Sequence, residues 1–68
     1  MQADLKNWFT YHAPKADQPE RYQEIRVAAL ALAETIDRCC PDCADKTATF
    51  RKLRETVMSA NQTIACNE

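Results

Sequence analysis

The sequence has no glycine in its 68 residues. Glycine is the residue that most readily adopts positive φ, which the tightest β-hairpin turns require. Its absence therefore disfavours folds built from short β-hairpins. Alanine, leucine, glutamate, lysine and arginine are abundant instead, and these residues have high helix propensity. The chain is therefore predicted to be all-α.

The length of the chain limits how stable a single copy can be. Sixty-eight residues form one domain at most, and short chains bury a smaller share of their surface than large ones. Ordering the chain costs about 1.5 kcal/mol per residue, whereas each fully buried large apolar side chain returns only about 1.5–3 kcal/mol. A lone hairpin of this size would be marginal. We therefore expect a metal, disulfides or further subunits to add stability.

Two long helices are predicted, over residues 17–38 and 44–65, joined by a connection at 39–43. Residues 1–16 are expected to hold a short helix over 3–9 and an aromatic segment. Asp17 is the predicted N-cap of the first long helix, with Pro19 in its first turn and Glu20 completing a capping box. Each long helix carries an apolar stripe at spacings of 3, 4, 3 and 4: Tyr22, Ile25, Ala29, Leu32 and Ile36, then Phe50, Leu53, Val57, Ala60 and Ile64. Similar lengths and a short connection predict a single domain, 1–68, built as an antiparallel hairpin.

Apolar residues also occur outside these two stripes, namely Val27, Leu30, Ala31 and Met58. They indicate a second buried face and hence a homo-oligomer. The alternative is that they are tolerated surface residues.

Charge and hydropathy exclude several function classes. The net charge is −1, with acidic and basic residues alternating, whereas proteins that coat DNA or RNA are strongly basic. Residues 1–6 lack the apolar core of a signal peptide, and no run is apolar enough to cross a membrane. We expect a cytoplasmic protein that binds neither a nucleic-acid polymer nor a membrane.

The cysteines raise the question of a metal site. Cys40 and Cys43 have C-x-x-C spacing beside Cys39, but Cys66 and His12 belong to the opposite end of the predicted hairpin, roughly 30 Å away. One chain is thus not expected to close a zinc site, and reduced cysteines are expected in the cytoplasm. With one histidine and no recognisable catalytic cluster, the chain is predicted not to be an enzyme, and no cofactor is expected. The role of the four cysteines stays open.

Aromatic and basic side chains are the best candidates for binding a ligand. Trp8, Phe9, Tyr11 and His12 crowd into five positions, which also fits a hydrophobic anchor for the N-terminus. The basic candidates are Lys15, Arg21, Arg26, Arg51 and Arg54. An arginine beside a helix seam can fork onto a phosphate and stack on a base, although each charge alone is more often solvated or paired. The residues by themselves predict an oligomeric helical hairpin with an unidentified ligand.

Three segments together resemble a known family: 7–14 (NWFTYHAP), 20–26 (ERYQEIR) and 53–61 (LRETVMSAN), the last followed by Ile64-Ala65. In combination they are similar to the small phage anti-CBASS sponge proteins, which share a helical hairpin domain with some phage anti-Thoeris sponges. Two departures are Ala13-Pro14, where the family is expected to have Pro-Pro, and the cysteine-rich connection.

The resemblance implies a homohexamer of hairpins that holds cyclic dinucleotides, and in many members cyclic trinucleotides, between protomers without cleaving them. It assigns stacking on a base to Tyr11 and phosphate contact to Arg26, where some relatives are expected to carry lysine. Trp8 and His12, beside Tyr11, are further candidate ligand contacts. Arg54 and Asn61 are the candidates for a trinucleotide pocket. The main alternative is an oligomeric helical protein-interaction module without a nucleotide ligand. Two further alternatives are a cyclic nucleotide hydrolase and a small regulator that binds nucleic acid.

Overall fold

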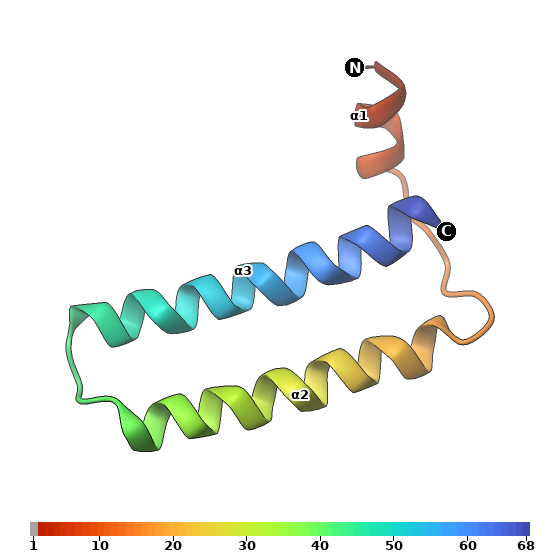
Figure 1. The fold of residues 1–68 in the computed structure, drawn as a ribbon. Coiled ribbons are helices and arrows are strands. Elements are labelled where there is room, and N and C mark those ends of the chain that lie inside the picture. Colours follow the sequence, from red (N-terminus) through yellow and green to blue (C-terminus); the bar gives the residue numbers. More distant parts are fainter. Residues whose placement is uncertain (1) are drawn as a thin grey trace.

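The computed structural model describes residues 2–68, with side chains from Asp4 onward. Over these residues it contains three helices and no strand: α1 (Gln2–Trp8), α2 (Gln18–Cys39) and α3 (Ala44–Asn67). Helices α2 and α3 run antiparallel, and α1 stands across the C-terminal end of α3 (Figure 1). The predicted all-α hairpin is thus confirmed. Helix α3 extends two residues further than expected. No helix in this part of the chain is long and apolar enough to cross a membrane.

The start of α2 differs from the prediction. Asp17 occupies the N-cap position and proline lies in the first turn, but the Asp17 side chain makes no capping hydrogen bond. Its φ and ψ of −89° and 9° are not the extended conformation that N-cap residues usually adopt. The carboxylate lies instead 3.3 Å from Arg21 Nε, one helical turn along. The predicted capping box is therefore wrong, because an ion pair takes the carboxylate away from the helix end.

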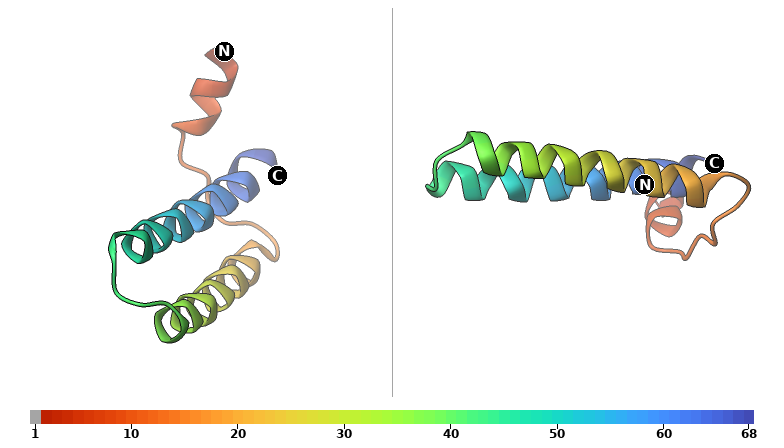
Figure 2. Two further views of the ribbon diagram at one scale, coloured as in Figure 1. Left: turned by 60° about the vertical axis from the view of Figure 1, so that its left-hand side comes forward. Right: turned by 90° about the horizontal axis from the view of Figure 1, so that it is seen from below.

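The end of α2 and the start of α3 follow from local chemistry. Cys40 adopts an extended conformation, and its N–H donates to the Ile36 carbonyl at 2.9 Å. Pro41 follows, which has no N–H with which to continue the helix. Cys43 is the N-cap of α3 without a side-chain capping bond, and its carbonyl accepts the Thr47 N–H at 3.2 Å. The connection is thus short enough to keep the two helices antiparallel (Figure 2).

The apolar stripe of α3 is confirmed, because all five predicted residues are half-buried. The stripe of α2 needs one correction. Leu32 is 50% exposed, and Ala33 is the half-buried residue instead. The half-buried apolar positions of α2 are therefore Tyr22, Ile25, Ala29, Ala33 and Ile36, at spacings of 3, 4, 4 and 3.

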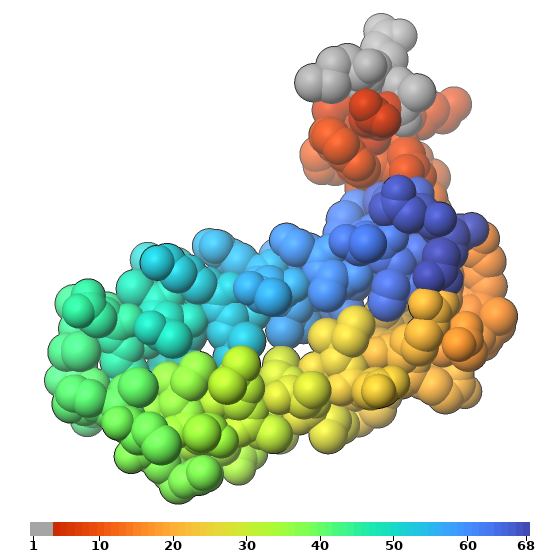
Figure 3. All heavy atoms as spheres, viewed as in Figure 1, coloured from red at the N-terminus to blue at the C-terminus, as the bar shows by residue number. Residues whose placement is uncertain are grey.

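The described residues of a single chain form no hydrophobic core. Among residues 4–68 no hydrophobic side chain is buried, and Gln18 is the buried polar residue, at 3% exposure. The molecule measures 43 × 28 × 13 Å, so its thinnest dimension is about one helix diameter. In the space-filling view, α2 and α3 form a single layer with no other described segment over the face in sight (Figure 3). Val27, Leu30 and Met58, predicted to form a second apolar face, are all exposed in one chain.

Helix α1 is fixed by partners for the carbonyls of its last turn, which have no partner within the helix itself. The Leu5 carbonyl accepts the Phe9 N–H, and the Lys6 carbonyl accepts the Thr10 hydroxyl. The carbonyls of Asn7 and Trp8 accept side chains from elsewhere: His12 Nε2 at 2.7 Å and Gln62 Nε2 at 3.3 Å. A helix of seven residues, too short to be stable alone, is thereby held against α3.

Candidate functional site

A groove between α2 and α3 brings together two of the predicted site residues, Arg26 and Arg54. We call it the arginine groove, and its volume is about 420 Å³. Its remaining lining is apolar: Ala29, Leu30, Ala33, Leu53, Val57 and Met58. The two arginines follow the seam residues Ile25 and Leu53 by one position, which places them on neighbouring flanks of the two helices. Leu30 and Met58 were singled out in the sequence as apolar residues outside the stripes.

The guanidinium groups of the arginine groove are available to an anion. In the described part of the chain, neither Arg26 nor Arg54 forms an ion pair, whereas Arg21 and Lys46 each pair with two carboxylates. Arginine presents a planar fork of donors that matches a phosphate, and its flat face can stack on an aromatic ring. An apolar floor between two such groups suits a ligand with both phosphates and flat bases.

Tyr11 lies on the segment that joins α1 to α2, residues 9–17, which we call the aromatic arm. Phe9 and Tyr11 are each 84% exposed. They therefore do not pack on the hairpin, and the interpretation of this segment as a hydrophobic anchor is wrong for these two side chains. Tyr11 lines neither the arginine groove nor the second groove described below. Within one chain, the two residues expected to contact a cyclic dinucleotide, Tyr11 and Arg26, do not share a pocket.

Trp8 lines a second, more polar groove of about 230 Å³ toward the C-terminal end of α3. The rest of that groove comes from α3: Ser59, Gln62, Thr63, Cys66 and Asn67. Trp8 is about half exposed. The sequence patterns did not single out these α3 residues, apart from Cys66, because isolated serine, threonine and glutamine residues on a helix carry no periodic signal.

His12 and Asn61 are held in different ways. His12 is half-buried, and its Nε2 donates to the Asn7 carbonyl, which fixes that ring nitrogen as the protonated one. Asn61 is half-buried on α3, and its Oδ1 is shielded from solvent without a hydrogen-bond partner among the described residues. An unpaired buried carbonyl is costly, roughly 1–3 kcal/mol, so Asn61 is a position where a donor from a ligand or a second chain would be favourable.

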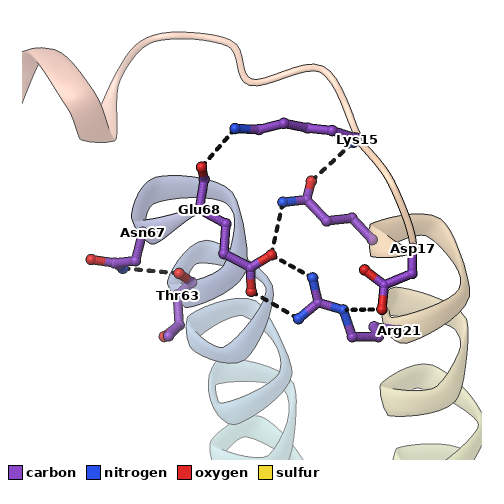
Figure 4. A network of polar contacts seen from close by, with 7 residues as sticks. Lys15, Asp17, Arg21, Thr63, Asn67 and Glu68 are labelled. Carbon is purple, nitrogen blue, oxygen red and sulfur yellow. Dashed lines mark hydrogen bonds and ion pairs between the residues drawn. The ribbon is translucent and has the colours of Figure 1, made fainter.

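A polar network joins the end of the aromatic arm to the end of α3 (Figure 4). Arg21 forks onto the carboxylate of Glu68, with Nη1 donating to Oε2 at 2.8 Å and Nη2 donating to Oε1. Gln18 Nε2 donates to Oε1 at 3.2 Å, and Lys15 Nζ donates to the main-chain oxygen of Glu68 at 2.6 Å. We call these four residues the Glu68 clamp. Two of the basic ligand candidates, Lys15 and Arg21, thus serve the fold.

Electrostatics within the clamp follow from this geometry. The hydrogen bonds from Arg21 and then Gln18 favour the ionised carboxylate and lower the pKa of Glu68 to about 2 from an ordinary value of 4.5. The same bond to Glu68, together with the Asp17 carboxylate, raises the pKa of Arg21. The Arg21 Nε contact with Asp17 at 3.3 Å brings the charges together, but it is too poorly directed to count as a hydrogen bond. No pattern in the sequence indicated the roles of Gln18 and Glu68, because lone polar residues at helix ends have many possible partners.

The connection holds a matching cation. Lys46 Nζ lies 2.9 Å from an Asp37 carboxylate oxygen and 2.8 Å from an Asp42 carboxylate oxygen. The hydrogen bonds that Lys46 donates to Asp42 and then to Asp37 raise the pKa of Lys46, and the Lys46 ammonium lowers the pKa of Asp42. Lys46 therefore ties the end of α2 to the start of α3.

The three connection cysteines, Cys39, Cys40 and Cys43, are exposed free thiols. No group of three or more histidine, cysteine or acidic residues in the described part of the chain is arranged to hold a metal ion. Cys66 lies at the opposite end of the hairpin, half-buried, and its thiol lies 3.7 Å from the Asn7 carbonyl. It contributes to the contact between α1 and α3, a role that the sequence did not reveal.

Comparison with known proteins adds one finding. A family model described as "Acb2/Tad1, hairpin domain" matches residues 1–65. Searches of curated proteins and of solved structures gave no match. The match covers α1, α2 and α3 up to residue 65. It includes the whole arginine groove, and the second groove except for Cys66 and Asn67.

Proposed function

Because the chain belongs to the Acb2/Tad1 hairpin domain family of anti-CBASS and anti-Thoeris sponges, we propose that it sequesters cyclic dinucleotides without cleaving them. Removal of the messenger would silence host CBASS signalling. We extend the proposal to cyclic trinucleotides as a second ligand class, with Arg54 and Asn61 as contacts. The family is a sponge-type hairpin rather than a known enzyme family.

The observation that carries this proposal is the arginine groove. Arg26 and Arg54 flank an apolar floor, and neither is neutralised by a carboxylate in the described structure. A cyclic dinucleotide carries two phosphates and two flat bases, which match guanidinium forks and apolar surface respectively. Arginine stays protonated in proteins, so these groups supply charge and hydrogen bonds but no general base. A rigid cyclic ligand also loses little conformational freedom on binding.

The position of Tyr11 supports a pocket made from more than one protomer. Tyr11 is exposed on the aromatic arm and lines neither groove, so a ligand touching both Tyr11 and Arg26 would draw them from different copies. Val27, Leu30 and Met58 present apolar surface that further copies would cover. We propose a homohexamer, the assembly expected for this family.

A capture-and-release experiment tests the proposal. Purified protein is mixed with a panel of cyclic di- and trinucleotides, free ligand is filtered off, and the denatured protein's ligands are chromatographed. The wild-type protein should retain at least one cyclic dinucleotide and return it intact. Arg26→Ala and Tyr11→Ala should each reduce retention at least tenfold. Arg51→Ala removes an exposed arginine outside the groove and should retain as much as the wild type.

Other outcomes lead to different functions. A nucleotide returned cleaved would make the protein a hydrolase. If no nucleotide is held at micromolar concentrations, the sponge proposal fails. The exposed apolar residues would then favour the alternative, an oligomeric protein-interaction module without a nucleotide ligand.

A further inference from the structure

The aromatic arm has no packing of its own that would fix Tyr11. Tyr11 is 84% exposed, and so is Phe9, two positions before it. An exposed ring on an irregular segment samples many positions unless the backbone on either side is held. The location of Tyr11 must therefore be determined by whatever holds the two ends of the arm.

The first end is held through α1. His12 Nε2 donates to the Asn7 carbonyl at 2.7 Å, which closes a turn around Tyr11. Asn7 Nδ2 in turn donates to the Cys66 carbonyl at 2.8 Å, and Gln62 Nε2 donates to the Trp8 carbonyl at 3.3 Å. These bonds end on the last two turns of α3.

The second end is held by the Glu68 clamp. Lys15 Nζ donates to the main-chain oxygen of Glu68 at 2.6 Å, and the Lys15 N–H donates to Gln18 Oε1 at 3.1 Å. Gln18 is 3% exposed, and its amide nitrogen donates to the Glu68 carboxylate. Figure 4 shows the arm passing over the end of α3 and turning into α2 at this network. Both ends of the arm are therefore attached to the C-terminal end of α3.

We propose that Glu68 is a positioning residue for nucleotide capture: it fixes the aromatic arm against the end of α3 and so places the Tyr11 ring where a base can stack on it. This inference rests on the proposed function. Glu68 itself does not touch the nucleotide. Its carboxylate joins Gln18 and Arg21 of α2 to α3, and its main-chain oxygen joins the arm through Lys15. When the clamp is broken, the arm should occupy the binding position for only part of the time, and the apparent affinity falls by that fraction.

The test compares Glu68→Gln with a matched control, Asp42→Asn. Each substitution replaces a carboxylate by its amide in a cluster where one cation meets two carboxylates, so the cation keeps one partner in both variants. The Asp42 cluster lies at the connection, away from the arm. Nucleotide affinity is measured by titration, and amide hydrogen exchange is measured at Lys15 and Gln18, whose N–H groups are bonded within the clamped turn.

Glu68→Gln should weaken nucleotide binding about tenfold and speed exchange at Lys15 and Gln18, while exchange in the middle of α2 and α3 stays unchanged. Asp42→Asn should leave both readouts at wild-type values. Lys15→Met, which removes the bond to the Glu68 main-chain oxygen and leaves the Arg21 pair intact, provides a second variant should Glu68→Gln fail to fold. Lys15→Met, like Glu68→Gln, should weaken nucleotide binding.

Three results would overturn the inference, and they are distinguishable. Equal affinities for wild type, Glu68→Gln and Lys15→Met would refute positioning by the clamp while leaving the sponge intact. A wild-type protein that retains no nucleotide would refute the proposed function and this inference together. Equal losses in Glu68→Gln and Asp42→Asn would show that general destabilisation, not positioning, governs affinity.

Discussion

Replacing Ala16 by glycine should stabilise this protein, which is the opposite of what glycine does at most positions. Ala16 has φ of 50°, and it is the residue with positive φ among those the structure describes. It sits on the aromatic arm just before α2, where the chain turns toward the Glu68 clamp. A sequence without glycine has placed alanine in a conformation that glycine adopts at no steric cost.

The expected gain is the difference between two opposing effects. The left-handed conformation costs an L-residue about 1–2 kcal/mol through contact between its Cβ and the following carbonyl oxygen. Glycine removes that contact but gives the unfolded chain more freedom, which costs about 0.4–1 kcal/mol. The net effect of Ala16→Gly should be a stabilisation of about 0.7 kcal/mol, since the steric relief is the larger. For a domain of this size that raises the melting temperature by roughly 3–6 °C.

Thermal unfolding at one fixed protein concentration measures this effect, because stability can depend on concentration in an oligomer. Ala13→Gly is the matched control: Ala13 is also exposed on the aromatic arm, but its φ is not positive. It should lose about 0.4–1 kcal/mol through the unfolded state alone. The two substitutions should therefore shift the melting temperature in opposite directions. If Ala16→Gly lowers it as Ala13→Gly does, backbone strain at Ala16 contributes nothing and the reasoning is wrong.

Three further predictions concern acid, the thiols and assembly. The pKa of Glu68 is lowered to about 2 from 4.5, so the contribution of the Glu68 carboxylate to stability is complete above pH 4.5 and disappears as the pH falls from 4.5 to 2. The Glu68→Gln variant should therefore lose less free energy of unfolding than the wild type when both are titrated over this pH range. Replacing the three connection cysteines together by serine should leave the stability within about 0.5 kcal/mol per site in chemical denaturation, because all three are exposed and unpaired; a larger loss would reveal a structural role. Met58→Asp places a charge on the exposed apolar face and should lower the mass measured by light scattering. An unchanged mass would exclude that face as a contact between copies.

The sequence predicted the hairpin well because its signals were local and redundant. Both long helices were expected within one or two residues of their observed bounds, and the α3 stripe was correct at every position. The α2 stripe failed at one position, because the pattern assigned Leu32 to the seam whereas Ala33 is the half-buried residue there. Spacings of 3 and 4 are present in both readings, so only the packed partner decides between them.

The prediction for Asp17 failed for a different reason. Aspartate before a proline-containing first turn is a strong capping signal, but its carboxylate pairs with Arg21 instead. The competing cation was visible four residues along. What the sequence could not show is Glu68, which holds Arg21 in place from the other end of the chain.

Site prediction was limited by the same long-range effect. Arg26 and Arg54 were singled out separately, for different ligands, and the structure brings them to one groove. Their meeting depends on the register between two helices, which no pattern within either helix specifies. The roles of Tyr11, Trp8, His12 and Asn61 toward a ligand stay predictions.

The thinness of this molecule has a consequence for dosage. A plate one helix thick has no interior of its own, and its described apolar side chains are at best half-buried. In the proposed assembly, the ordered hairpin and the complete pocket would both arise only when copies meet. Capacity would then rise more steeply than in proportion to the number of chains made, with little capture below a threshold and nearly full capture above it. In a cell that had made only a few copies, the cyclic nucleotide messenger would stay free and host signalling would continue. The timing of synthesis would then determine whether signalling is silenced as much as the affinity of the site does.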